Sequence, residues 1–153
     1  PFEFGHTYLA GGTIERIRAL GLRDRFILTG LVPPAKIPEL TNAMAILVHP
    51  SRREGLARAL AQGGLAAKPI ITYDVDGNRE GLLDGDSGFV IPPFEREELR
   101  QAIETLAADG AMRARFGAAG RVFALRRFDA AVMVDKLDAL YRSILNERAA
   151  GEK

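Results

Sequence analysis

The chain has 153 residues, of which 47% are apolar and 27% charged, enough apolar material for one folded domain with a core. Its net charge of +1, with arginines interspersed among acids, argues against a nucleic-acid-binding surface. The absence of cysteine excludes disulfides, thiolate metal sites and cysteine nucleophiles, and it fits a cytoplasmic protein. No apolar run approaches the roughly 20 residues of a membrane helix, and no pattern indicates a signal peptide. Because the chain starts at Pro1 and not at Met, we expect it to be processed or cut from a longer one.

Short runs of β type alternate with helical patterns in the first part of the chain. The expected strands are Arg25–Thr29, Ala45–His49, Pro69–Tyr73 and Gly88–Ile91, with a further β-type run at His6–Ala10. The expected helices are Thr13–Leu20, Pro34–Asn42 and Arg58–Ala67. In the first of these helices Thr13 is in position to act as the N-cap and Gly21 as the stop.

Beyond Pro93 the pattern is helical throughout. We expect helices at Glu95–Ala108, Ala111–Ala119 and Ala130–Arg148. The last helix has an apolar stripe that we expect to face the core, formed by Val134, Leu137, Leu140, Tyr141, Ile144 and Leu145.

Alternation of apolar strands with helices predicts an α/β domain, a Rossmann-like parallel sheet with helices on both faces. Such sheets bind ligands beyond the carboxyl ends of their strands. The turns after Ala10, Thr29, His49 and Tyr73 are therefore the expected places for function.

The turn after His49 has the residues of an anion and sugar site. Free N–H groups at Gly55 and Leu56, with the dipole of the following helix, favour a diphosphate, and Gly55 lets a ligand approach the backbone. Glu54 is a poor neighbour for phosphate but a good acceptor for sugar hydroxyl groups. Added positive charge is available from Arg52, Arg53 and Arg58.

A structural interpretation explains the same pattern as well. The spacing of Ser51 and Glu54 is that of a capping box, and the arginines then form a solvated face. The turn after Tyr73 contains Gly77, which permits close backbone approach, and Glu80 in the first turn of a short helix. An ordinary loop would explain that second turn equally well.

Four blocks in this order resemble one family. They are Pro50-Ser51-x-x-Glu54-Gly55, the run Gly64 to Ile71, the run Asp74 to Glu80, and the run Asp84 to Pro92. Together they resemble the C-terminal, donor-binding domain of GT-B glycosyltransferases, of the retaining family 4 or "group 1" type. The resemblance covers roughly Leu9 to Tyr141.

The resemblance implies a nucleotide diphosphate sugar as substrate, with no cofactor and no metal. Glu54 then binds hydroxyl groups of the donor sugar, and Gly55 and Leu56 meet the diphosphate. Gln62 stands where the family has a second Glu that binds the ribose. The remaining implied positions near the phosphates, the base and the second turn are Ser51, Arg52, Arg53, Gly30, Leu31, Val32, Gly77, Asn78 and Glu80. Asp74-Val75-Asp76 has the spacing of a metal motif, but Gly77 and Glu80 fit the family block better.

The resemblance also implies missing parts. The family's donor domain begins with a further strand and helix that carry an Arg and a Lys for the diphosphate, and its N-terminal domain binds the acceptor. We therefore expect one partial domain over residues 1–153, with 130–148 as its C-terminal helix, that transfers a hexose only within a full-length protein. Peripheral membrane association would also need the full-length protein. The alternatives are a non-catalytic binding or scaffold subunit that needs a partner chain, and a relative of GT-B sugar epimerases.

Overall fold

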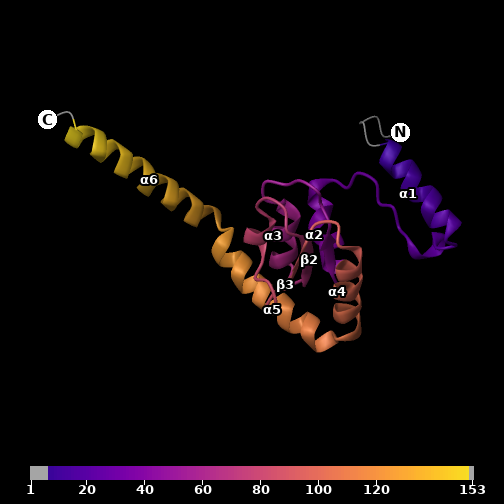
Figure 1. Cartoon of the computed structure of the whole chain (residues 1–153). Coiled ribbons are helices and arrows are strands. Elements are labelled where there is room, and N and C mark those ends of the chain that lie inside the picture. Colours follow the sequence, from indigo (N-terminus) through magenta and orange to yellow (C-terminus); the bar gives the residue numbers. More distant parts are fainter. Residues whose placement is uncertain (1–6, 152–153) are drawn as a thin grey trace. The chain divides into compact units, whose positions relative to one another are not determined.

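The chain divides into two units, Pro1–Pro34 and Ala35–Lys153. A computed structural model describes the backbone of residues 7–151 and the side chains of residues 12–148 (Figure 1). None of the helices within that range has the length and apolarity that crossing a membrane requires.

The first unit contains helix α1 (Thr7–Ala19) and the 3₁₀ turn η1 (Arg23–Arg25). Gly21 ends α1 as predicted: its φ is 66°, and its N–H bonds to the carbonyl oxygen of Arg18. The predicted β-type run is wrong over Thr7–Ala10, which is helical, while His6 lies outside the described residues. Thr13 consequently lies inside α1 and is not its N-cap. The helix continues through Gly11 and Gly12, since helix-weakening glycines cost only about 1 kcal/mol each.

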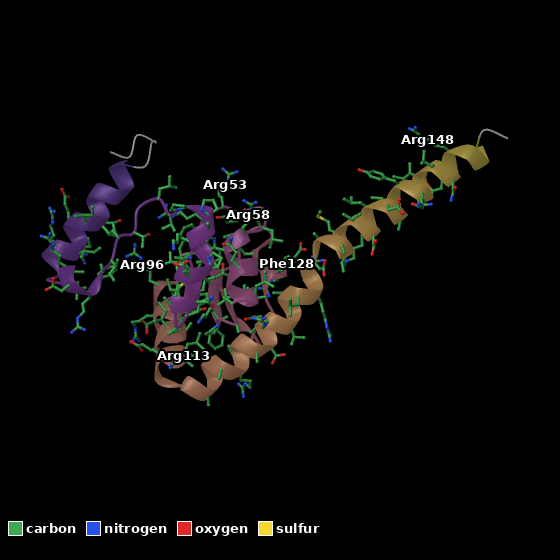
Figure 2. The ribbon with its side chains drawn as sticks, turned by 180° about the vertical axis from the view of Figure 1, so that it is seen from behind. Arg53, Arg58, Arg96, Arg113, Phe128 and Arg148 are labelled. Atoms are coloured by element: carbon green, nitrogen blue, oxygen red, sulfur yellow. The ribbon has the colours of Figure 1, made fainter. Side chains whose placement is uncertain are left out.

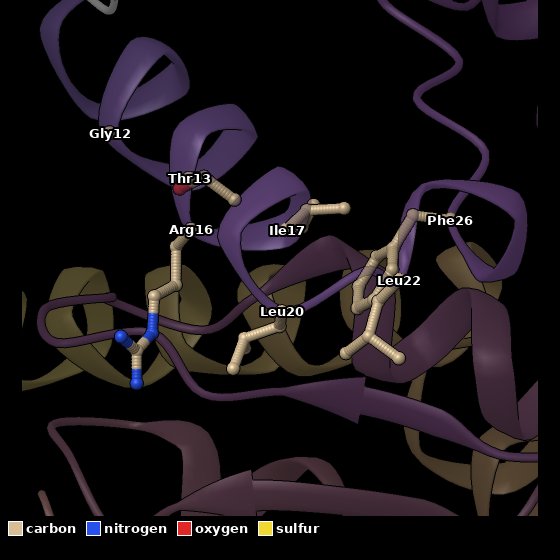
Figure 3. Close-up of a pocket in the computed structure, with 7 residues that line it drawn as sticks. All are labelled: Gly12, Thr13, Arg16, Ile17, Leu20, Leu22 and Phe26. Carbon is tan, nitrogen blue, oxygen red and sulfur yellow. The ribbon is translucent and has the colours of Figure 1, made fainter.

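The predicted strand Arg25–Thr29 is also absent. Phe26 has extended backbone angles, but no strand pairs with this segment among the described residues. Phe26, Ile27 and Leu28 are 50%, 91% and 62% exposed. An apolar run becomes a strand only when a neighbour satisfies its backbone, and this run has none. Figure 3 shows a mostly apolar pocket in this unit, which is lined by Gly12, Thr13, Arg16, Ile17, Leu20, Leu22 and Phe26.

The second unit is built on a parallel sheet of three strands in the order β1-β2-β3. The strands are β1 (Leu47–His49), β2 (Ile70–Tyr73) and β3 (Gly88–Ile91), each within its predicted run. In the register of the sheet His49 pairs with Thr72, and Thr72 pairs with Val90. The parallel α/β architecture expected from the sequence is confirmed.

The helices of this unit connect and follow the strands. They are α2 (Ile37–Ala43), α3 (Arg58–Leu65), η3 (Asn78–Gly81), α4 (Arg96–Ala108), α5 (Gly110–Arg127) and α6 (Ala130–Gly151), and they are preceded by η2 (Pro34–Lys36), which begins at the last residue of the first unit. Each overlaps a helix expected from the sequence, although α5 continues eight residues beyond the predicted end at Ala119. The 3₁₀ turn η3 contains Glu80, as predicted.

Successive residues of β2 pack into different parts of the core. Ile70 packs with Leu60 of α3, whereas Ile71 packs with Leu106 of α4 and Phe116 of α5. Because successive strand residues point to opposite faces, helices cover both faces of the sheet. The sheet is thereby held between two helical layers, and its carboxyl end is left for the loops.

The apolar stripe of α6 does not face a core. Val134, Leu137, Leu140, Tyr141, Ile144 and Leu145 are 42% to 64% exposed. The helix itself was predicted correctly, but its periodicity says only that one face is apolar and not what covers that face.

Candidate functional site

Three loops gather at the carboxyl end of the sheet because all its strands are parallel. Residues 50–57 follow β1, residues 74–77 follow β2 and residues 92–95 follow β3. Asp76 and Phe94 have positive φ angles of 44° and 70°. Side chains with a Cβ adopt such angles at a cost, and these conformations cluster where a loop is held for function. The turns after β1 and β2 are those in which the sequence placed the site.

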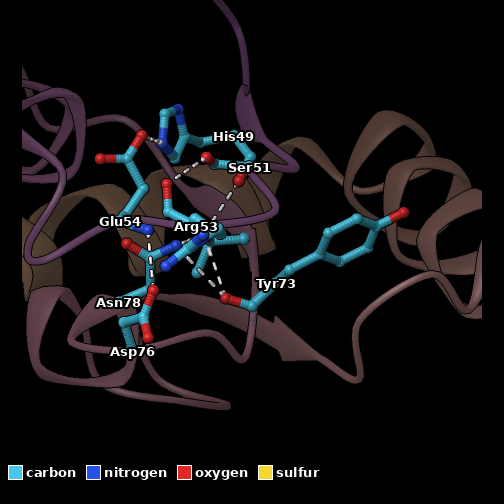
Figure 4. Close-up of polar contacts among 8 residues, drawn as sticks. His49, Ser51, Arg53, Glu54, Tyr73, Asp76 and Asn78 are labelled. Atoms are coloured by element: carbon cyan, nitrogen blue, oxygen red, sulfur yellow. Dashed lines mark hydrogen bonds and ion pairs between the residues drawn. The ribbon is translucent and has the colours of Figure 1, made fainter.

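Glu54, in the loop after β1, is held from two directions (Figure 4). Its backbone N–H donates a hydrogen bond of 2.9 Å to Asp76 Oδ2, in the loop after β2. Its carboxylate Oε1 lies 3.3 Å from Nε2 of His49, the last residue of β1. The Glu54 side chain is nevertheless 33% exposed. The carboxylate is therefore positioned and still open to a ligand that donates hydrogen bonds.

A buried chain of hydrogen bonds supports the end of β1. Thr72 Oγ1 donates to the backbone oxygen of His49 over 2.9 Å, and Asn78 Nδ2 donates to Thr72 Oγ1 over 3.1 Å. Thr72 is 1% exposed and Asn78 is fully buried. Asn78 Oδ1 has no hydrogen-bond partner among the described residues, but the two hydrogen bonds link β1, β2 and η3 and limit their relative movement. Asn78, a predicted site residue, thus contacts the inner side of the loops rather than solvent.

The loops after β1 and β2 touch through their glycines. A Cβ on Gly77 would lie 2.0 Å from the backbone oxygen of Gly55, so only glycine allows this contact. A Cβ on Gly55 would meet no atom within 4 Å. The space beside Gly77 is thus filled by the neighbouring loop, whereas the space beside Gly55 is open.

The capping-box interpretation of Ser51 and Glu54 is wrong. Helix α3 begins at Arg58, its N-cap is Ala57, and no side chain caps it. Ser51 Oγ instead donates to the backbone oxygen of Arg53 over 3.2 Å. The loop after β1 is too long for a serine seven positions before the helix to reach its first N–H groups. Glu54 is therefore free of a capping role.

The loop that carries Glu54 also contains hydrogen-bond donors and cations. Among the described residues, the N–H groups of Gly55 and Leu56 have no hydrogen-bond acceptor. Arg53 and Arg58 are exposed and form no ion pair within the described part of the chain. Figure 2 shows both arginines at the same end of the second unit, opposite Arg113. Unpaired N–H groups before a helix, with cations nearby, are suited to an anion such as a diphosphate.

Arg52 links the loops that follow the two outer strands. Its guanidinium lies 5.3 Å from the ring centroid of Phe94, a cation–π contact. The Phe94 ring also lies 6.2 Å from the ring of Tyr73, at the end of β2. Phe94 is 59% exposed. Arg52 is thus engaged with an aromatic ring at the rim of the site.

Two other predicted side chains, Gln62 and Glu80, lie on α3 and in η3. Gln62 is exposed on α3, one turn after Arg58 and on the same helical face. The carboxylate of Glu80 accepts a hydrogen bond of 2.6 Å from Arg127 of α5.

The two aspartates with metal-motif spacing bind separate partners. Asp74 accepts hydrogen bonds from Arg79, and this partner lowers the pKa of Asp74 below its usual 3.8. Asp76 accepts the N–H of Glu54.

Gly30, Leu31 and Val32 belong to the first unit. Gly30 has a positive φ of 63°, and Leu31 is 84% exposed. Their role near a nucleotide base stays a prediction.

Sequence reasoning did not assign site roles to His49, Asp76 and Phe94. Asp76 carries a recognisable signal, because aspartate before glycine in a turn tolerates positive φ and accepts backbone N–H groups. The approach of His49 to Glu54 and of Phe94 to Arg52 depends on how the loops fold back, which no local pattern reveals.

Comparison with known proteins shows the family to which the chain belongs. Residues 11–123 match the model of the family described as "Glycosyl transferases group 1". The chain is 31% identical over 128 residues to the alpha-D-kanosaminyltransferase of Streptomyces kanamyceticus, covering 84% of this chain and 33% of that protein. The chain thus spans about a third of this relative.

Solved structures show the same fold. Anabaena Alr3699/HepE in complex with UDP superimposes with a TM-score of 0.85 at 27% identity, over 92% of this chain and 38% of that one. Its complex with UDP-glucose gives a TM-score of 0.83 at 26% identity, with the same coverage. From the family match and this shared GT-B fold, we conclude that the chain belongs to the glycosyl transferase group 1 family.

Proposed function

We propose that the loops after β1 and β2 bind the nucleotide diphosphate sugar donor of a retaining glycosyltransferase that transfers a hexose. The observation that carries the proposal is the position of Glu54. Its partly exposed carboxylate stands in the same loop as the unpaired N–H groups of Gly55 and Leu56. One loop thus offers an acceptor for sugar hydroxyl groups and donors for phosphate oxygens.

The comparisons support this proposal at the level of ligand class. Anabaena Alr3699/HepE, at 26–27% identity, has been solved with UDP and with UDP-glucose. The relative from Streptomyces kanamyceticus is named for transfer of kanosamine. These ligands belong to those proteins, and for this chain they define which nucleotide sugars are tested first.

In the proposed mechanism the chain binds the donor and stabilises the departing diphosphate. The N–H groups of Gly55 and Leu56, the start of α3 and the exposed Arg53 and Arg58 meet the negative charge that develops on the leaving group. Glu54 holds the sugar ring through its hydroxyl groups while the transition state gains oxocarbenium character. The acceptor is bound by another part of the full-length protein or by a partner chain.

Calorimetry with a panel of nucleotide sugars and free nucleotides tests the proposal. We expect the chain to bind a nucleotide sugar more tightly than the matching nucleoside diphosphate. Glu54→Gln should weaken nucleotide-sugar binding roughly 10- to 100-fold, the scale of a hydrogen bond to a charged group. Binding of the free nucleoside diphosphate should stay within about twofold of wild type.

Glu147→Gln is the matched control, since it removes the same charge from α6 at a residue with no ion pair in the described part of the chain. It should bind every ligand as wild type does. Absence of binding to the whole panel by a folded sample contradicts the proposal, as does equal loss of sugar and nucleotide binding in Glu54→Gln.

A further inference from the structure

We propose that His49 is the positioning residue of Glu54: its imidazole fixes the orientation in which the carboxylate meets the hydroxyl groups of the donor sugar. The inference deepens the proposed function and rests on it. It names a residue that acts through Glu54 and does not itself touch the reacting atoms.

The geometry of the pair is the first observation. His49 Nε2 lies 3.3 Å from Glu54 Oε1, slightly beyond the usual hydrogen-bond range. The same nitrogen is buried, and it has no hydrogen-bond partner among the described residues. A buried polar atom without a partner is unfavourable, and Glu54 Oε1 is the acceptor within reach. A small rotation of the Glu54 side chain completes this hydrogen bond in the free protein when Nε2 carries the proton.

The surroundings leave His49 little freedom to move. It ends β1, and its backbone oxygen accepts the hydrogen bond from the buried Thr72, which in turn accepts one from Asn78. The His49 side chain is only 24% exposed. The imidazole is therefore presented from a rigid strand end and not from a flexible loop.

The backbone of Glu54 is also held in place. Its backbone is tied to Asp76 through the N–H, and the adjoining Gly55 packs against Gly77. The rotations of its own side chain are the freedom that remains. An imidazole beside Oε1 restricts those rotations and leaves the other carboxylate oxygen for the ligand. Orienting an acceptor before binding lowers the entropic cost of binding.

The first arm of the test compares His49→Gln, His49→Asn and His49→Leu by calorimetry. Glutamine places an amide N–H close to the position of Nε2, asparagine is too short to reach it, and leucine offers no donor. The readout is the ratio of the dissociation constants of UDP and UDP-glucose. We expect the ratio to fall roughly tenfold in the Asn and Leu variants, the scale of one charge-assisted hydrogen bond. In His49→Gln it should stay near wild type, and UDP alone should bind every variant equally.

The second arm needs no ligand. NMR three-bond couplings of the Glu54 side chain report whether it occupies one rotamer or several. We expect one rotamer in wild type and in His49→Gln, and averaging in His49→Asn and His49→Leu. The backbone amide spectrum of each variant shows that the fold is kept.

The outcomes separate the inference from the proposed function. If wild type binds none of the nucleotide sugars, the proposed function fails, and the side-chain couplings alone decide whether His49 orients Glu54. A Glu54 that averages in wild type, or keeps one rotamer in His49→Leu, overturns the inference. Equal weakening of UDP and UDP-glucose in the Asn and Leu variants also overturns it, because a general structural role would do that.

Discussion

Gly77 sets how closely two loops of the candidate site approach each other. Its missing Cβ makes room for the backbone oxygen of Gly55, and this contact holds the loop in which Glu54 is bound to Asp76. The carboxylate is thus placed by a backbone contact as much as by its own hydrogen bonds. Loops held in this way offer a preformed site, which costs less conformational entropy when a ligand binds.

Replacing Gly77 or Gly55 by alanine should have different effects on the stability of the fold. Gly77→Ala puts a Cβ 2.0 Å from a backbone oxygen, so we expect it to lower the free energy of unfolding by about 1–3 kcal/mol, the scale of an overpacked contact. Gly55→Ala meets open space and should change stability by no more than about 0.5 kcal/mol. Urea unfolding measures both.

Nucleotide-sugar binding also distinguishes the Gly77→Ala variant from the Gly55→Ala variant. If a ligand approaches the backbone at Gly55, Gly55→Ala weakens nucleotide-sugar binding without a loss of stability. Similar stability losses in the two variants would contradict the loop contact.

Asp74 offers a prediction about pH. Its pKa is lowered below 3.8, first of all by the hydrogen bond from Arg79. A carboxylate with a lowered pKa in the folded state stabilises the fold above its unfolded-state pKa, and this contribution is lost as the pH falls through the folded value. Arg79→Ala should therefore raise the pKa of Asp74, and the stability difference from wild type should disappear in acid.

Carbon-detected NMR of the Asp74 carboxyl group follows that titration directly. Arg53→Ala, which removes an arginine without an ion pair in the described part of the chain, is the control and should leave Asp74 unchanged. An Asp74 that titrates at the same pH with and without Arg79 would refute the assignment.

At the scale of elements, the contact between α3 and α5 supports the helix that starts at the site. Small residues bring the helices together: a Cβ on Gly64 would lie 2.9 Å from Cβ of Ala124 and 3.2 Å from the backbone oxygen of Gly120. Arg121 of α5 also donates to the backbone oxygen of Leu65, the last residue of α3. The carboxyl end of α3 is therefore fixed against α5.

Two glycines of α5 test how closely this helix packs, and alanine at each should have a different effect on stability. In Gly117→Ala the new Cβ would lie 2.1 Å from the backbone oxygen of Ala67, so we expect a loss of about 1–3 kcal/mol despite the higher helix propensity of alanine. In Gly110→Ala the Cβ meets only the end of the Arg113 side chain at 3.5 Å. That variant should be neutral or slightly more stable. A Gly117→Ala variant as stable as wild type in thermal unfolding would show that α5 has room to move away from the turn that follows α3.

The sequence predicted the elements of the second unit well and those of the first unit poorly. Continuous apolar runs such as Gly88–Ile91 are typical of buried parallel strands, and this one was predicted to the residue. The run Arg25–Thr29 has similar composition but no neighbouring strand among the described residues, so local preference was not enough. For α6 the periodicity predicted the helix, but the stripe expected to face the core is exposed within the described part of the chain.

For the whole molecule, the order of the four blocks was enough to predict both the fold and the family. Each block lies where the chain passes between a strand and a helix, so the spacing of the blocks carries the topology of the sheet. The side-chain contacts of the site could not be predicted from the sequence. His49 and Phe94 reach Glu54 and Arg52 only after the loops fold back over the sheet end, and these contacts depend on the complete fold.

The central claim is that a nucleotide sugar binds at the carboxyl end of this sheet. The most direct measurement is a titration of the ¹⁵N-labelled chain with UDP-glucose, followed through its backbone amide signals. The account predicts that the largest shifts fall on Glu54, Gly55 and Leu56, since their loop carries the carboxylate and the unpaired N–H groups. Saturable shifts that leave these three amides unchanged would contradict it.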